Sequence, residues 1–249
     1  IIIIMVMMMM MVIATQSDDD DDDDVDVHDD DGAFMIIMMV AMQSDDMVTV
    51  TVDSWVEFEP VGETAVSTAF IFYPGGRVDY RSYAPAACAI AEEGYLVIIP
   101  PMPLSLAVFD ANAADDIIAA YDEIENWVIG GHSLGGAMAS SYVYSHEGEL
   151  DGLVLWAAYP AENNDLSSRA LPALSIYGTE DGAAAELPEV GERLLPEPEW
   201  LVMDGGNHAQ FGYYGVQSGD GVATISREEQ HAIFTEATAA FLESVESGE

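Results

Sequence analysis

Short apolar runs alternate with longer helical patterns from about residue 46 to the end of the chain. Apolar runs that end at glycine, proline or polar residues are typical of buried strands. The first two runs also alternate apolar and polar positions, which predicts a hairpin. The predicted strands are 47–51, 55–60, 67–76, 95–100, 127–131, 151–158, 173–178 and 199–206.

Four longer stretches predict helices between and after these strands. They cover 81–94, 110–124, 132–146 and 226–245. The last has Ser226 at its start and Glu229 three residues later, which is a capping-box pattern. Strands that alternate with helices predict an α/β protein, with a mainly parallel sheet and helices on both faces. Ligands of such proteins bind beyond the carboxyl ends of the strands.

The first 42 residues differ from the rest of the chain. They hold an apolar opening (1–14), an aspartate-rich run (18–31) and a second apolar patch (34–42). We therefore divide the chain into a low-complexity segment, 1–42, and one domain, 43–249. The opening is shorter than the ~20 residues of a spanning helix and has no basic flank. It is open to three interpretations: a membrane-associating anchor remnant, an element packed on the body, or a tail.

Charge excludes several classes of function. The chain has 46 acidic and 5 basic residues, a net charge of −41, so a nucleic-acid binder is not expected. Such acidity causes self-repulsion that molar salt screens, which favours an origin in a halophile. Two locations stay open: the cytoplasm, or a membrane-anchored position outside it. In both cases we expect an environment of high salt. The oligomeric state is not predicted.

The aspartate-rich run does not predict a specific metal site. It lacks the spaced ligands and closing glutamate of an EF-hand loop. Long blocks of like charge are usually solvated. The single cysteine, Cys88, excludes a cysteine-based zinc site and an internal disulfide. We therefore expect no metal and no other cofactor.

Residues 131–135, Gly-His-Ser-Leu-Gly, match the pattern G-x-S-x-G between an apolar strand and a helix rich in small residues. This context is typical of a nucleophile elbow, in which small neighbours allow a strained serine to project above the sheet. The free N–H groups of the following helix would stabilise a developing negative charge. The pattern predicts Ser133 as a nucleophile, rather than an incidental serine in a glycine-rich turn.

A nucleophilic serine needs a general base, and the base needs an orienting acid. His208 directly follows the strand at 199–206, so it is predicted at the same edge of the sheet. The acid should precede it in the chain. Asp181 lies before a glycine in the loop after the strand at 173–178 and is preferred, with Glu180 as the alternative.

The oxyanion hole should include the backbone N–H of Leu134, the residue after the serine. A second donor is expected in the glycine loop after 67–73, from either Gly76 or Arg77. The segment 100–110 could line a pocket or belong to the core. Met102, Leu104 and Phe109 are the residues of this segment that would line the pocket, and Tyr73 and His132 are further residues expected there.

Four segments carry a resemblance to the α/β-hydrolase fold superfamily. They are IGGHSLGGAMA, FYPGGRVDYRSYAPAACAIAEEGYLVIIPPMPLSLAVF, LSIYGTEDG and DGGNHAQFGYYG. More narrowly, the chain over about 43–246 resembles a group of small, lidless hydrolases near the dienelactone-hydrolase-like proteins. The resemblance implies the α/β-hydrolase fold with a minimal lid or none, and a triad of Ser133, Asp181 and His208.

The sequence therefore predicts a serine hydrolase that cleaves a carboxylic ester or related small acyl substrate through an acyl-enzyme. Two alternatives are a catalytically silent binding protein on the same fold and an acidic, cation-binding surface or interaction protein. The fold itself does not determine the substrate.

Overall fold

Eight strands form one sheet in the computed structural model, which describes residues 30–62 and 66–248. The strand order is β1-β2-β4-β3-β5-β6-β7-β8, and β1 and β2 form the predicted hairpin. The hairpin joins β4 through an antiparallel pairing, and the other neighbours are parallel. The strands are β1 (Val48–Val52), β2 (Val56–Pro60), β3 (Thr68–Tyr73), β4 (Leu96–Ile99), β5 (Asn126–His132), β6 (Gly152–Trp156), β7 (Ala173–Gly178) and β8 (Glu199–Met203).

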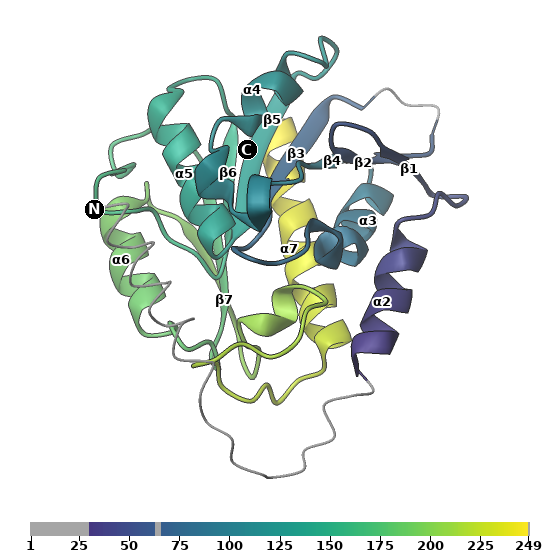
Figure 1. The fold of residues 1–249 in the computed structure, drawn as a ribbon. Helices are drawn as coiled ribbons and strands as arrows, with labels where there is room; N and C mark the ends of the chain where they lie inside the picture. Colours follow the sequence, from purple (N-terminus) through teal and green to yellow (C-terminus); the bar gives the residue numbers. More distant parts are fainter. Residues whose placement is uncertain (1–29, 63–65, 249) are drawn as a thin grey trace, which may run out of the picture.

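Helices lie on both faces of this sheet, as the sequence predicts (Figure 1). The α-helices are α2 (Asp30–Ala41), α3 (Ala84–Glu92), α4 (Ala113–Ile118), α5 (Leu134–Ser145), α6 (Glu186–Leu194) and α7 (Arg227–Ser247). Short 3₁₀ turns are η1 (Tyr80–Tyr83), η2 (Pro103–Ser105), η3 (Ala107–Phe109) and η4 (Ala209–Phe211). Ser226 caps α7 by accepting a hydrogen bond from the Glu229 N–H, as predicted.

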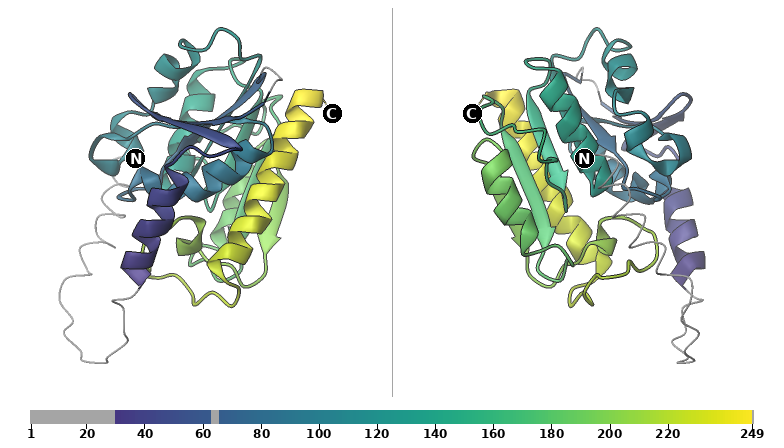
Figure 2. Two further views of the ribbon diagram at one scale, coloured as in Figure 1. Left: turned by 90° about the vertical axis from the view of Figure 1, so that its right-hand side faces the viewer. Right: turned by 60° about the vertical axis from the view of Figure 1, so that its left-hand side comes forward.

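Alternate residues of the central strands face opposite cores, because strand side chains point to the two faces in turn. In β3, Phe70 and Phe72 belong to the core beneath α3 and α7, whereas Ile71 belongs to the core beneath α4 and α5. Every residue of β3 is buried. This two-sided burial explains why the strands appear as continuous apolar runs. Figure 2 shows α5 and α7 on opposite sides of the sheet.

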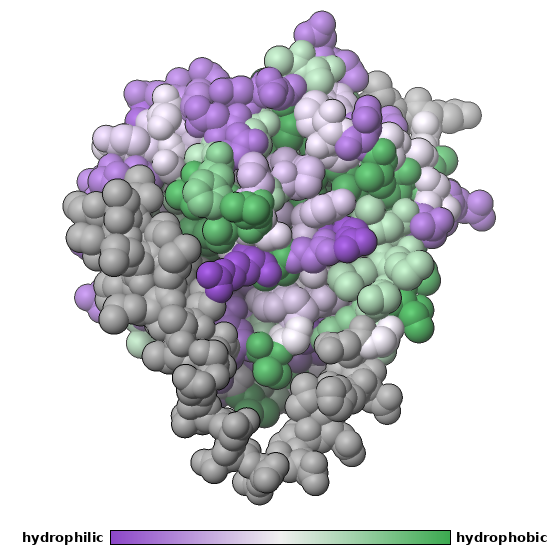
Figure 3. Space-filling view, viewed as in Figure 1, coloured by the Kyte–Doolittle hydropathy of each residue, from purple (hydrophilic) through white to green (hydrophobic). Residues whose placement is uncertain are grey.

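Helix α2 covers part of the body next to α3. It lies within the segment 1–42 and packs against α3 and η1, and the Phe34 ring contacts Tyr213 edge to face at 5.5 Å. Its outer side chains Met35, Ile36 and Met39 are exposed. Figure 3 shows hydrophobic residues gathered on this side of the molecule. The apolar opening and most of the aspartate run fall at 1–29, outside the described residues.

One local prediction needs correction, and one helix has no counterpart among the predicted elements. The predicted helix 110–124 is only α4, and its cap is Asn112 rather than Asp110. The chain turns after α4, and the Tyr121 hydroxyl accepts a hydrogen bond from the Trp55 indole at 3.1 Å. Helix α6 was not predicted, because Pro188 and Gly191 interrupt its pattern.

The described connection between β6 and β7, residues 157–172, has no helix or strand. This connection leaves no room for a lid domain, in agreement with the predicted minimal lid. Within 30–62 and 66–248, none of the helices has the length and apolar character needed to cross a bilayer.

Candidate active site

Ser133 lies at a strained turn between β5 and α5. Its φ of 52° and ψ of −120° are unfavourable for a residue with a side chain. Its N–H donates to the carbonyl of Trp156 on the neighbouring strand at 3.0 Å, and its carbonyl accepts from Ala137 N–H at 3.1 Å. The turn is therefore held by β6 on one side and by α5 on the other. Ser133 is half-buried, at the carboxyl edge of the sheet.

Small residues allow this turn to form. A methyl group on Gly135 would lie 2.0 Å from the Tyr73 carbonyl oxygen. On Gly131 it would lie 2.6 Å from the same oxygen. The first turn of α5 thus packs directly on the end of β3, where a side chain has no space. The two glycines of the motif are explained by this close approach.

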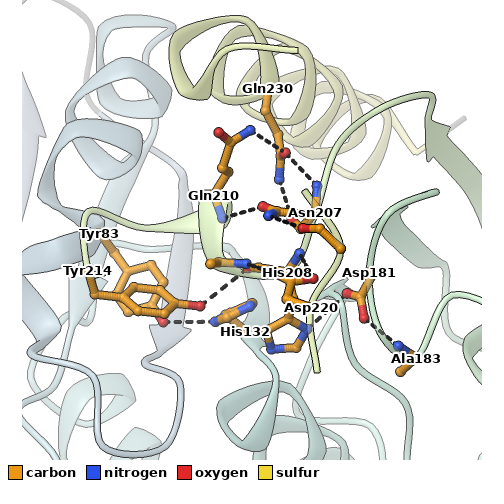
Figure 4. Close-up of polar contacts among 12 residues, drawn as sticks. Tyr83, His132, Asp181, Ala183, Asn207, His208, Gln210, Tyr214, Asp220 and Gln230 are labelled. Atoms are coloured by element: carbon orange, nitrogen blue, oxygen red, sulfur yellow. Dashed lines mark hydrogen bonds and ion pairs between the residues drawn. The ribbon is translucent and has the colours of Figure 1, made fainter. Parts of the chain in front are cut away.

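His208 and Asp181 form a buried hydrogen-bonded pair. His208 Nδ1 lies 2.9 Å from Asp181 Oδ2, and the two side chains are 8% and 1% exposed. The other carboxylate oxygen of Asp181 accepts the Ala183 N–H at 2.8 Å, which fixes the carboxylate (Figure 4). His208 Nε2 is buried and has no hydrogen-bond partner among the described residues. In the neutral ring with Nδ1 donating to the carboxylate, Nε2 carries the free lone pair.

The pair lies beside the elbow. The ring of His132, the residue before Ser133, has its centroid 4.5 Å from that of His208. The structure therefore brings the predicted base and acid together, next to the predicted nucleophile. A hydrogen bond from the Ser133 hydroxyl to His208 Nε2 is not formed in the described structure. Such bonds are often long before substrate binds.

Polar side chains hold the His208 loop in place. Asp220 accepts the N–H groups of His208 at 3.0 Å and Ala209 at 2.8 Å. Burial raises the pKa of the Asp220 carboxyl. Gln230 of α7 is fully buried and pairs with the backbone of Asn207, accepting its N–H at 3.0 Å and donating to its carbonyl at 2.8 Å (Figure 4).

Sequence reasoning missed Asp220 and Gln230. Asp220 gives no signal, since its partners lie in another part of the loop. Gln230 could have been found, because it shares the buried face of α7 with Phe234 and Thr238. A glutamine on an apolar face needs a polar partner.

One of the two alternatives for the second oxyanion donor is removed by the structure. The Arg77 N–H donates to the Ser105 carbonyl at 2.7 Å, so it is not available to a substrate oxygen. The N–H groups of Gly76 and Leu134 make no hydrogen bond to the described residues. The two residues are neighbours, because a methyl group on Gly76 would lie 2.9 Å from Leu134 Cδ2.

The residues expected to line a pocket differ widely in how exposed they are. Tyr73 is fully buried, and its hydroxyl donates to the Ala111 carbonyl and accepts the Ala114 N–H. Tyr73 therefore belongs to the core, and the prediction that it lines a pocket is wrong. Met102 is buried in the same core, whereas Leu104 is 82% exposed. His132 is 1% exposed and lies beneath His208 rather than in an open pocket.

No group of three or more histidine, cysteine, aspartate or glutamate side chains suited to a metal ion occurs in the part of the chain that the structure describes. The carboxylate of the predicted triad is engaged by a histidine and a backbone N–H instead.

A model of the alpha/beta hydrolase family matches residues 69–232. Among curated proteins, none matches the sequence. Three solved structures show the likeness of fold. A CIB-like hydrolase from Thermoplasma acidophilum has a TM-score of 0.57 at 16% identity and covers 78% of this chain and 99% of its own. TT1662 from Thermus thermophilus has a TM-score of 0.57 at 13% identity, and it covers 80% of this chain and 98% of its own. Carboxyl esterase 2 from the fungus Tuber melanosporum has a TM-score of 0.62 at 12% identity, and it covers 82% of this chain and 88% of its own.

Proposed function

Since the chain belongs to the alpha/beta hydrolase family, we propose that it is a serine hydrolase that cleaves a carboxylic ester or a related acyl substrate. The observation that carries the proposal is the buried Asp181–His208 hydrogen bond, with the free Nε2 of His208 beside the strained Ser133 turn. The structural neighbours share the fold only, at 12–16% identity, and do not identify the substrate.

In the first step, Ser133 Oγ attacks the carbonyl carbon while His208 Nε2 takes its proton. The C–O double-bond pair moves to oxygen, and the N–H groups of Gly76 and Leu134 donate to this oxyanion. Asp181 keeps the Nδ1 proton in place and stabilises the imidazolium.

The collapse of the tetrahedral intermediate breaks the ester C–O bond. His208 Nε2 returns its proton to the departing oxygen, and an alcohol leaves an acyl group on Ser133. Water then attacks the acyl carbon, with His208 again accepting and returning a proton. This second half releases the acid and restores the serine hydroxyl.

The elbow also contributes at the start of α5. Ser133 immediately precedes this helix, which begins at Leu134. The N-terminal N–H groups and the helix dipole stabilise negative charge as it forms on the substrate. The carboxylates that dominate the surface give no such help, so the site depends on backbone donors.

A fluorophosphonate serine probe tests this function directly. We expect labelling of Ser133, located by mass spectrometry, in the folded protein at multi-molar salt. The Ser133→Ala protein should not react, and His208→Ala should react at least about 100-fold more slowly, because the base is lost. A folded protein that no probe labels at any salt concentration would contradict the proposal and favour a silent binding protein.

A further inference from the structure

His132 occupies an aromatic box directly below the predicted base. Its ring stacks on Phe211 at a centroid distance of 5.4 Å and lies 5.8 Å from the Tyr83 ring and 6.1 Å from that of Tyr214. His208 closes the remaining side at 4.5 Å. The proposed mechanism gives His132 no role, although it is the residue immediately before the nucleophile.

The Tyr83 hydroxyl connects His132 to the predicted oxyanion loop. It accepts the Gly75 N–H at 3.1 Å and lies 2.8 Å from His132 Nδ1 (Figure 4). A hydroxyl has one proton, and the Gly75 N–H already uses a lone pair of the oxygen. The proton of Tyr83 therefore points to His132 Nδ1, which acts as an acceptor.

This contact fixes the state of the His132 ring. Burial, with a further contribution from His208, holds the pKa of His132 well below its ordinary value. The ring is therefore neutral and carries its proton on Nε2. Burial also raises the pKa of the Tyr83 hydroxyl, which keeps the phenol as a donor.

The loop is pressed tightly onto this pair. A methyl group on Gly75 would lie 2.7 Å from the Tyr83 oxygen and 2.8 Å from His132 Nδ1. Gly75 is thus required for the contact, and its N–H is turned inward to Tyr83. The next N–H, on Gly76, has no such partner among the described residues and is the predicted donor to the oxyanion.

We propose that Tyr83 and His132 are positioning residues that hold the Gly75–Gly76 loop and the His208 ring at a fixed separation. The inference rests on the proposed function. In the attack step, negative charge forms beside Gly76 at the same moment as positive charge forms on His208. One rigid pair supports both groups, so a change in it misplaces both in the transition state.

Three variants test the pair with p-nitrophenyl acetate as substrate. Tyr83→Phe removes the hydroxyl, and His132→Leu removes its acceptor. Both should lower kcat about tenfold or more and leave KM within about twofold, because the lost interaction acts on the transition state. His132→Asn places a side-chain oxygen near the position of Nδ1 and should keep kcat within about threefold of wild type.

Tyr142→Phe is the matched control, since it removes a tyrosine hydroxyl that bonds Asp115 at 2.8 Å, outside the site. It should have wild-type kcat. Circular dichroism and thermal unfolding identify any variant that does not fold, and the His132→Leu and His132→Asn pair then decides the question if Tyr83→Phe is unfolded.

Two results would overturn the inference. One is a folded Tyr83→Phe or His132→Leu protein with wild-type kcat. The other is a loss of activity that His132→Asn does not restore, which would indicate a packing role only. Labelling of wild-type Ser133 by the fluorophosphonate separates these results from failure of the proposed function. Without that labelling both proposals fail, and with it only the positioning role is rejected.

Discussion

Asp181 and Glu180 are adjacent carboxylates with different surroundings. The Asp181 side chain is 1% exposed and accepts hydrogen bonds from His208 and the Ala183 N–H, whereas the hydrogen bond and ion pair of His208 Nδ1 are with Asp181 and not with Glu180. Its position in the loop favours Asp181, and so does the geometry. The carboxylate can fix the imidazole tautomer only through this direct contact.

Asp181→Asn should therefore lower kcat for p-nitrophenyl acetate by roughly 10³–10⁴-fold, because an amide at this position favours the wrong tautomer of His208. Glu180→Gln removes the neighbouring charge and should stay within about threefold of wild type. Steady-state kinetics at high salt measures both. A fall of less than tenfold in Asp181→Asn would remove Asp181 from the proposed triad.

The strained turn at Ser133 depends on backbone contact between α5 and β3. Gly135→Ala would place a methyl group 2.0 Å from the Tyr73 carbonyl oxygen, and backbone at that position cannot rotate away. We expect a loss of unfolding free energy of about 3 kcal/mol or more, at the upper end of overpacking costs. Urea unfolding at fixed salt measures it.

Gly215→Ala is the control for this prediction. A methyl group there meets nothing within 4 Å, so stability should stay within about 0.5 kcal/mol of wild type. If both variants were equally stable, the close packing of α5 on β3 would not be what the motif glycines provide.

Helix α7 buries a histidine that makes stability depend on pH. Burial lowers the pKa of His231 to about 3, with a smaller contribution from Arg227. The ordinary value in an unfolded chain is about 6.5. Between these values the unfolded chain binds a proton that the folded protein does not bind. Stability is therefore lost as the pH falls from about 6.5 towards 3.

His231→Phe should reduce this loss by up to about 1.4 kcal/mol per pH unit between pH 6 and pH 4. Phenylalanine can occupy the same position against Phe234 and Tyr213. Unfolding free energies from urea titrations at several pH values give the slope. Thr235→Val, a change on the same buried face that removes no titratable group, should retain the wild-type slope.

The elements show why some of the fold could be predicted and some could not. The buried central strands are recognisable because both faces are covered, so every position in β3 is apolar or small. Helix α4 ends at Ile118, and the segment after it bonds Trp55 through Tyr121, a contact between residues far apart in the sequence that no local pattern reveals. Helix α6 has Leu187, Val190 and Leu194 on one face, but Pro188 and Gly191 hide that period.

The same division applies to the candidate site. Ser133, Asp181 and His208 each follow a strand, and parallel strands bring their carboxyl ends to one edge. Tyr83 and Asp220 come from a 3₁₀ turn and a surface loop, where no period predicts orientation. The loop position of Arg77 predicts a possible donor equally well, but its N–H donates to the Ser105 carbonyl.

Charge is a property of the whole molecule, and in this protein it is strongly unbalanced. The chain has 46 acidic residues and 5 arginines, with no lysine. In the described residues, three arginines form surface ion pairs with acids, namely Arg81 with Asp79, Arg169 with Glu147, and Arg193 with Glu162. Exposed pairs of this kind contribute about 0–1 kcal/mol each. Repulsion among the remaining carboxylates therefore outweighs attraction.

Salt should stabilise the folded protein as a result. Raising KCl from 0.1 M to 2 M shortens the Debye length from about 10 Å to less than 3 Å. Screening weakens the few ion pairs slightly but removes most of the repulsion that a net charge of −41 produces in the compact state. We expect the urea midpoint and the thermal midpoint to rise together across this range.

Sucrose at matched water activity serves as the control, since it stabilises by exclusion from the surface without screening charge. Equal midpoints at both salt concentrations would contradict the high-salt interpretation, and would mean that the hydrated carboxylates are far enough apart to leave the fold unstrained in dilute buffer.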